Sequence, residues 1–217
     1  MATTLRHSPF EFSRNTRKVS DPQVTYAELL SDLKPLNMTE LVMYVRTYVQ
    51  ERTPAAFSSQ PMLWEAVREW VASRLKVYPR EFGLSGSAQT GFSLAKRKSG
   101  APFNPLGSDL DMFVVNKDFF SIVETEARMF SVRNADSVNF AAQAATVSRQ
   151  VQMGYLDLNQ VPANHDLYPR ISAARNDASI VIDRLRLHGF ELKPSLFRIY
   201  KDWGELSSWV RRSYSSV

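Results

Sequence analysis

Apolar residues recur at every third or fourth position over most of the chain, which is the spacing of helices that bury one face. Start and stop signals accompany the pattern: Glu40 follows Asn37 in the capping-box position, Pro61 can begin a helix, and Gly189 can end one. The predicted helices are Thr25–Leu33, a segment after Asn37 with a stripe from Leu41 to Val49, Pro61–Leu75, Phe119–Phe130, Val138–Val147 with Asp136 as a candidate cap, Leu167–Leu185, and a last helix from Pro194 through Val210.

Three shorter stretches favour β-strands, namely 81–85, 109–115 and 150–161. Because side chains alternate along a strand, the last of these would place five residues on one face: Val151, Met153, Tyr155, Asp157 and Asn159. A few strands among many helices predict an α+β fold, in which helices pack against a small mixed β-sheet.

Residues that can carry chemistry gather around two of these strands. Asp109 and Asp111 are two positions apart and would project from the same side, where two carboxylates repel each other unless a cation lies between them. A hard divalent ion such as Mg²⁺ suits such oxygen ligands best. The turn that holds Gly86 and Ser87 offers backbone N–H groups and a hydroxyl, which suit a phosphate. The two segments together predict a site for a metal ion and a triphosphate.

A Gly-Ser turn followed by an Asp-x-Asp strand resembles the signature of the nucleotidyltransferase superfamily that includes DNA polymerase beta. The resemblance covers about the middle third of the chain and implies a nucleotidyltransferase-like sheet topology. It also implies two Mg²⁺ ions on Asp109, Asp111 and Asp157, the last on a strand beside the Asp-x-Asp strand. A hydroxyl group would attack the α-phosphate of a nucleoside triphosphate and release pyrophosphate, with Asp157 holding the second ion or taking the proton. The nucleotide-binding residues that it implies are Gly86, Ser87, Gly91, Ser108 and Lys96.

Two parts of this interpretation have a plainer alternative. Asp157 lies between two leucines, where a carboxylate is costly unless it is paired or binds metal, but it would be unremarkable on an exposed edge strand. The connection 88–108 spans 21 residues, longer than is usual in compact members of the superfamily, and contains the basic run 96–98. That run could reach a leaving pyrophosphate, although charge runs are more often a solvated surface.

The domain organisation follows from the same pattern. Residues 1–21 are polar, mildly basic and without periodicity, which predicts a flexible arm. Residues 22–217 would form one domain, in which 22–60 is a helical extension, 61–162 the catalytic core and 163–217 a set of C-terminal helices.

Composition indicates the class and location of the protein more than its reaction. The 217 residues are 44% apolar and 23% charged, as in ordinary globular proteins, and they include no cysteine for a disulfide, a thiolate metal site or a nucleophile. The net charge of +5 weakly favours an anionic partner such as a nucleotide or nucleic acid. No segment reads as a membrane span or a secretory signal, so we expect a cytoplasmic location without membrane partners.

The sequence therefore predicts a Mg²⁺-dependent enzyme that transfers a nucleoside monophosphate to a hydroxyl group on a protein, a tRNA end, a small molecule or a second nucleotide. It does not choose among these acceptors, and its length argues against a templated polymerase. One alternative is a non-catalytic nucleotide-sensing or partner-binding module of the same fold. Such a module would act with a protein from a neighbouring gene, as in toxin–antitoxin or phage-defence pairs. A second alternative is an all-helical scaffold in which the acidic motif is incidental.

Overall fold

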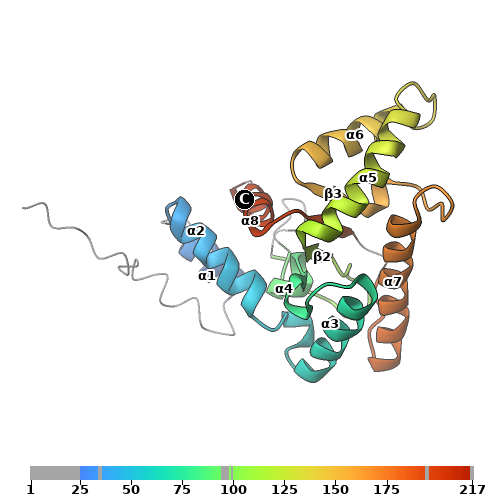
Figure 1. The fold of residues 1–217 in the computed structure, drawn as a ribbon. Helices are drawn as coiled ribbons and strands as arrows, with labels where there is room; N and C mark the ends of the chain where they lie inside the picture. Colours follow the sequence, from blue (N-terminus) through green and yellow to red (C-terminus); the bar gives the residue numbers. More distant parts are fainter. Residues whose placement is uncertain (1–24, 34–35, 94–97, 99, 194–195, 216–217) are drawn as a thin grey trace, which may run out of the picture.

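A small mixed β-sheet lies at the centre of the protein in the computed structural model, which describes residues 25–33, 36–93, 98, 100–193 and 196–215 (Figure 1). Its strand order is β1-β2-β4-β3. The central strands β2 and β4 run parallel, and each outer strand runs antiparallel to its neighbour. The strands are β1 (Phe82–Leu84), β2 (Met112–Val115), β3 (Tyr155–Asp157) and β4 (Phe197–Tyr200).

Helices surround this sheet, so the α+β class predicted from the sequence is confirmed and the all-helical alternative is excluded. In the described part of the chain the α-helices are α1 (Tyr26–Leu33), α2 (Met38–Val45), α3 (Pro61–Leu75), α4 (Gly86–Thr90), α5 (Lys117–Arg133), α6 (Ala141–Gln152), α7 (Pro169–Leu185) and α8 (Trp203–Ser215). A π-helical segment, η2 (Arg46–Glu51), continues α2. Short 3-10 turns lie at η3 (Ala55–Phe57), η4 (Pro79–Glu81), η6 (Leu158–Gln160) and η7 (Arg186–His188). Within the described ranges no helix is both long and apolar enough to cross a membrane.

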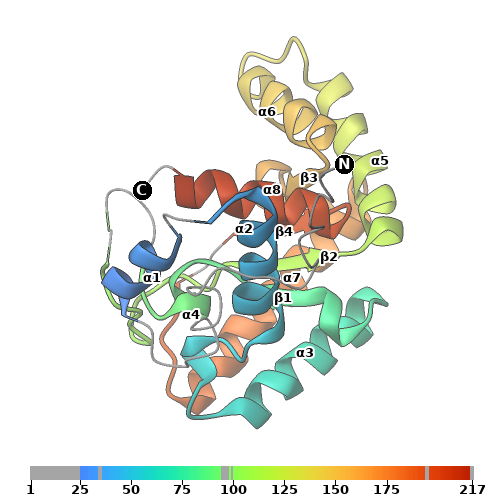
Figure 2. The same cartoon turned by 90° about the vertical axis from the view of Figure 1, so that its left-hand side faces the viewer.

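The sheet buries its two faces against different helices. Met112, Val114 and Leu156 join the main hydrophobic core with α3, α5, α6 and α7. The opposite face carries Phe113 and Tyr200, which form a second cluster with Leu206 and Val210 of α8. In Figure 2, α8 and α2 lie in front of the strands and α7 lies behind them. We refer to these as the α7 face and the α8 face.

Local signals placed several helices correctly. Asn37 caps α2 by accepting hydrogen bonds from the N–H groups of Thr39 (3.0 Å) and Glu40 (3.1 Å), and Glu40 accepts one in return from the Asn37 N–H (3.1 Å). Pro61 is the first residue of α3. Gly189 follows η7 with a left-handed φ of 86°. The capping box and both of these boundaries are confirmed.

The largest correction concerns the last predicted helix. The segment after Pro194 forms strand β4, and helix α8 begins only at Trp203. The apolar stripe predicted for this helix includes Ile199 and Tyr200, which in β4 are adjacent residues and enter the two clusters on opposite faces of the sheet. Pairing with both β2 and β3 stabilises the extended form, and tertiary pairing of this kind overrides a short helical pattern.

Other boundaries also differ from the prediction. The strand predicted over 150–161 is limited to β3, because α6 extends to Gln152 and a 3-10 turn follows Asp157. Met153 and Asn159 therefore do not share a strand face with Asp157. Helix α6 starts at Ala141 with Phe140 in the N-cap position, so Asp136 does not cap it.

Buried polar contacts join the helices behind the sheet. Glu126 of α5 is 7% exposed, and its carboxylate accepts hydrogen bonds of 2.9 Å each from the N–H groups of Arg170 and Ile171. These N–H groups belong to the first turn of α7, where they have no acceptor within the helix itself and where a negative charge is stabilising. Arg74 of α3 pairs with Asp177 of α7 at 3.0 Å. The two contacts fix α7 relative to α5 and α3.

The packing of Phe113 over Gly83 gives a stability prediction. A Cβ atom built on Gly83 would lie 2.5 Å from Cζ of Phe113, so Gly83→Ala must displace a buried ring. We expect a loss of about 1–3 kcal/mol in the free energy of unfolding, measured by urea titration. Val132→Ala, at a side chain that is 80% exposed, should change it by less than about 0.5 kcal/mol. Equal losses in the two variants would show that Phe113 moves at no cost.

Candidate functional site

One end of the sheet collects the acidic residues and the Gly-Ser turn. Strand β1 ends there at Leu84, β2 and β4 begin there, and β3 ends there at Asp157. The turn 85–87 and the Asp-x-Asp segment 109–111 adjoin these strand ends directly. We call this the carboxylate end of the sheet.

Gly86 and Asp111 are in direct contact. A Cβ atom on Gly86 would lie 2.6 Å from Oδ2 of Asp111, and Gly86 has a left-handed φ of 65°. The Ser85 N–H donates a 2.8 Å hydrogen bond to the Asp111 carbonyl oxygen. Glycine is needed here for two reasons, because a side chain would be strained by the backbone and would strike the carboxylate.

The turn continues into the short helix α4. A residue of the N-terminal extension contacts this helix. Gly91 ends α4 with a φ of 89°, and its N–H donates to the Ser87 carbonyl oxygen at 2.8 Å. The buried Gln89 side chain donates to the carbonyl of Arg52 at 3.4 Å. Ser87 itself is half-buried. Gly91 thus has a clear role in shaping the turn, whereas its contact with a nucleotide stays a prediction.

Asp109 and Ser108 lie just before β2 and not within it, which corrects the strand predicted over 109–115. Asp109 makes an isolated parallel bridge with Lys193 and is exposed. The Ser108 hydroxyl accepts a 2.9 Å hydrogen bond from the N–H of Asn104, and its carbonyl accepts one of 3.2 Å from the N–H of Lys193. The Ser108 side chain therefore already serves a local turn.

The long connection between the two motifs has structure where it is described. Phe92 and Pro102 form an antiparallel bridge, and the Ser93 N–H donates to the Ala101 carbonyl oxygen at 2.7 Å. Lys96, predicted to bind the nucleotide, lies outside the described residues. Lys98 is exposed.

Asp157 is 4% exposed and does not lie on a strand next to β2, because β4 is inserted between them. This corrects the expected adjacency. Its carboxylate accepts a 3.1 Å hydrogen bond from the Asn159 N–H and a second from the Gln160 side chain. Asp157 is therefore a buried carboxylate that caps a turn, and not an exposed residue of the sheet edge.

Burial makes the ionised form of two of these carboxylates unfavourable. Loss of water raises the pKa of Asp111, and the charges of Asp109 and Asp157 raise it further, while Arg198 and a hydrogen bond from the Leu196 N–H lower it. Burial likewise raises the pKa of Asp157, against the Asn159 hydrogen bond and the charges of Arg198 and Arg175. Asp109 and Asp157 are thus close enough to Asp111 to raise its pKa.

Arg198 is the residue of this site that the sequence interpretation missed. It lies on β4 directly opposite Asp157, and its charge acts on both Asp111 and Asp157. The guanidinium carbon lies 4.4 Å from the centre of the Trp209 ring on α8. The alternation of apolar and polar residues in Phe-Arg-Ile-Tyr at 197–200 is the signal that favours a strand and would place Arg198 on one face of the sheet.

The acidic side chains do not form a ready metal site. Among the residues that the structure describes, no three His, Cys, Asp or Glu side chains gather closely enough to hold a metal ion together. Asp109 and Asp111, separated by one residue, are of the right chemical type for a shared Mg²⁺. Asp157 faces Arg198 instead.

A pocket of about 340 Å³ adjoins the carboxylate end on the α7 face. Met112 and Phe197, the first residues of the two central strands, contribute to its apolar part. Its polar lining includes Asn159, His165 and Arg175, and the positive charge of Arg175 acts to lower the pKa of Asp157. A mixed apolar and hydrogen-bonding lining of this kind suits a small organic group.

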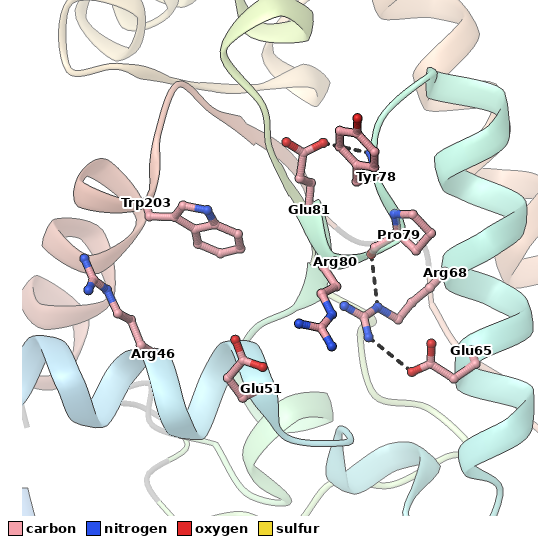
Figure 3. A pocket seen from close by; sticks show the side chains of 9 residues that line it. All are labelled: Arg46, Glu51, Glu65, Arg68, Tyr78, Pro79, Arg80, Glu81 and Trp203. Atoms are coloured by element: carbon pink, nitrogen blue, oxygen red, sulfur yellow. Dashed lines mark hydrogen bonds and ion pairs between the residues drawn. The ribbon is translucent and has the colours of Figure 1, made fainter.

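A larger cleft of about 1130 Å³ lies at the opposite end of the sheet (Figure 3). Trp203 projects into it from one side, where Arg46 also lies, and Glu65 and Arg68 lie on the other, with Arg80 between them. Arg68 is already engaged, because it pairs with Glu65 at 3.1 Å and donates to the Pro79 carbonyl oxygen. This cleft is separate from every residue of the predicted site.

Comparisons of the chain with protein-family models, with curated proteins and with solved structures find no match.

The contact between Gly86 and Asp111 gives a matched test. Gly189→Ala introduces a side chain at a left-handed position with nothing within 4 Å, and we expect a loss of about 1–2 kcal/mol in unfolding free energy. Gly86→Ala adds the clash with Asp111, so its loss should be larger by about 1 kcal/mol or more. In an Asp111→Ala background this excess should disappear. An excess that persists there would place the strain elsewhere than at the carboxylate.

Burial of Asp157 predicts a pH dependence of stability. Because its pKa is raised above the ordinary value of 3.8, the native state binds more protons than the unfolded state between the two values, and stability falls as pH rises through that interval. Asp157→Asn keeps an acceptor oxygen without the charge. We expect it to unfold at higher urea concentration than wild type at pH 7 and to show a smaller decrease with pH.

Asp183→Asn is the matched control for this substitution, because the Asp183 side chain is 63% exposed and should leave the pH dependence unchanged. If Asp157→Asn is less stable than wild type at pH 7, the hydrogen bonds of the carboxylate outweigh the cost of burying its charge.

Proposed function

We propose that the protein is a Mg²⁺-dependent nucleotidyltransferase that transfers a nucleoside monophosphate from a nucleoside triphosphate to a hydroxyl group, with release of pyrophosphate. The contact of Gly86 with the Asp111 carboxylate is the observation that carries this proposal. It joins the segment suited to phosphate and the segment suited to metal, which are separated in sequence, at one end of a mixed sheet. This arrangement supports a nucleotidyltransferase-like topology.

The roles of the residues follow from their chemistry. Ser87 and the backbone N–H groups of the turn would bind the outer phosphates of the nucleotide, as Gly86 leaves room for close approach. Asp109 and Asp111 would hold Mg²⁺, which supplies charge stabilisation at the triphosphate and lowers the pKa of a bound hydroxyl. Asp157, buried with a raised pKa, is the candidate acceptor of the hydroxyl proton.

The pocket on the α7 face would receive the nucleobase or the acceptor. Its amide and imidazole groups, from Asn159 and His165, can donate and accept hydrogen bonds, and Phe197 contributes apolar surface. Protein, tRNA, small-molecule and nucleotide acceptors all remain open, as does a protein partner from a neighbouring gene. We propose a cytoplasmic setting for this reaction.

A non-catalytic nucleotide-binding module of the same fold is the second candidate. The observation that favours it is that Asp157, the expected third carboxylate, lies opposite Arg198 on β4 and already accepts hydrogen bonds from Asn159 and Gln160. Such a module would bind the triphosphate at the turn and pass the signal to a partner without turnover.

Turnover of labelled nucleotides separates the two candidates. The protein, alone and with cell extract, is incubated with Mg²⁺ and each of the four NTPs labelled at the α-phosphate, and pyrophosphate release and label transfer are measured. We expect Asp109→Ala and Asp111→Asn to reduce the rate at least about 100-fold, since the metal supplies several kcal/mol of charge stabilisation. Asp183→Asn, an exposed aspartate on α7, should retain the wild-type rate.

Nucleotide binding without pyrophosphate release or label transfer would favour the module. Turnover that is unaffected by Asp109→Ala and Asp111→Asn would contradict the assignment of the site.

A further inference from the structure

Hydrogen bonds fix the wall of the large cleft that lies opposite the carboxylate end. Arg68 of α3 donates from Nε to the Pro79 carbonyl oxygen of η4 at 3.1 Å. Glu81, the last residue of η4, accepts hydrogen bonds from the Tyr78 N–H (2.8 Å) and from the Asn116 side chain (2.9 Å). Asn116 in turn caps α5. This side of the cleft is therefore a preformed surface that is tied to two helices.

The charged side chains that line the cleft differ in how far they are engaged. Glu65 is paired with an arginine of α3 at 3.1 Å, and Glu81 accepts the two hydrogen bonds just described. Arg46 and Arg80 are exposed, and neither contacts a charged or hydrogen-bonding partner within the described ranges. Glu51 is the one lining carboxylate without such a contact in the same ranges. Two unengaged guanidinium groups thus face one unengaged carboxylate, which favours an anionic ligand.

Two aromatic rings border the same cleft. Trp203 is half-buried and projects into it from α8, as Figure 3 shows. Tyr78 lies between α3 and η4 and is 77% exposed, so its ring contributes little to the core. Its backbone is nevertheless held by the hydrogen bond to Glu81, and Pro79 follows it directly. Aromatic faces that are held in place beside arginines are the means by which proteins stack nucleobases and bind the adjoining phosphates.

The size of the cleft favours a polymer over a small molecule. Its volume of about 1130 Å³ exceeds the roughly 300–1,000 Å³ of pockets that enclose small ligands. A duplex would keep its base faces stacked inside, out of reach of the rings, whereas a single strand presents both bases and phosphates. An acidic peptide would engage the arginines but would leave the rings unused.

We propose that this cleft binds a single-stranded segment of RNA or DNA, with Arg46 and Arg80 at the phosphates and Trp203 and Tyr78 stacked on bases. The inference goes beyond the proposed function, because none of these residues belongs to the carboxylate end.

Fluorescence anisotropy of labelled oligonucleotides tests the proposal on the full chain, without Mg²⁺ or nucleoside triphosphates. The probes are single strands of RNA and of DNA, each of about 12 nucleotides, the matching duplexes, and an abasic DNA strand of equal length. We expect wild type to bind at least one base-bearing single strand at about 50 mM salt, and to bind the duplexes and the abasic strand at least about 5-fold more weakly.

Charge variants locate the binding. Arg46→Gln and Arg80→Gln should each weaken binding several-fold and lower the slope of log K against log salt by about 0.7, the value for one phosphate contact on a single strand. Arg186→Gln is the matched control, because Arg186 is 58% exposed, lies outside the cleft and changes the net charge equally. Glu51→Gln should strengthen binding several-fold, because it removes the opposing charge. A gain of affinity of this kind cannot come from misfolding.

Stacking is tested at the more exposed of the two rings, whose removal leaves the core intact. Tyr78→Ala should weaken binding of the base-bearing strand about 5-fold or more and leave binding of the abasic strand unchanged. Leu187→Ala, at a side chain that is 85% exposed and outside the cleft, should affect neither.

Several results would overturn the proposal. These are the absence of binding at low salt, equal affinity for base-bearing and abasic strands, equal losses in Arg80→Gln and Arg186→Gln, and weaker binding in Glu51→Gln. Displacement of the probe by poly-glutamate as readily as by unlabelled strand would assign the cleft to acidic peptides instead. Each of these results leaves the nucleotidyltransferase proposal standing, since the assay contains neither its metal nor its substrate.

Discussion

The cost of burying carboxylates at one end of the sheet is the constraint around which this structure is arranged. Asp111 and Asp157 lose much of their hydration there and raise each other's energy when ionised. A fold selected for stability alone would place apolar or neutral side chains at such positions. The chain instead places an arginine on the strand between them and directs two of its N–H groups, from Leu196 and Asn159, at the carboxylates.

The Gly-Ser turn belongs to the same arrangement. Its backbone is tied to the Asp111 backbone through Ser85, and its glycine lies against the Asp111 side chain. A ligand that orders the turn would therefore act on the carboxylate directly, and a cation bound to the carboxylate would act on the turn. The helical extension reaches the same place, because Gln89 of α4 contacts Arg52 beyond η2. The N-terminal helices are in this way part of the support of the site.

Local sequence signals predicted much of this structure. The capping box at Asn37 and the proline that begins α3 depend only on residues within one turn of the helix start. Such signals can be recognised in the sequence alone. The proximity of Asp111 to the Gly-Ser turn was also expected, because the two segments were predicted to form one site. The motif residues were named correctly as neighbours because a turn and an adjacent antiparallel strand leave few arrangements open.

The part that was not predicted depends on pairing between distant segments. Residues 197–200 fit a helical stripe as well as a strand, and only their partners 112–115 and 155–157 decide between the two. With β4 assigned to a helix, Arg198 could not be placed, and Asp157 was expected one strand too close to β2. Whether Asp157 is buried could not be read from its leucine neighbours either, since η6 turns the chain immediately after it.

The position of β4 has a consequence for the order in which the protein can assemble. The two central strands are parallel, and the second of them comes more than eighty residues after the first. Until that late segment leaves the ribosome, β1 and β2 can form only a two-stranded hairpin, which is marginal in water, while β3 has no partner at all. Phe113 and Tyr155 would meanwhile be without the Tyr200 ring that they contact in the finished sheet. We expect the nascent chain to depend on its helices, and on chaperones, until its central strand is inserted.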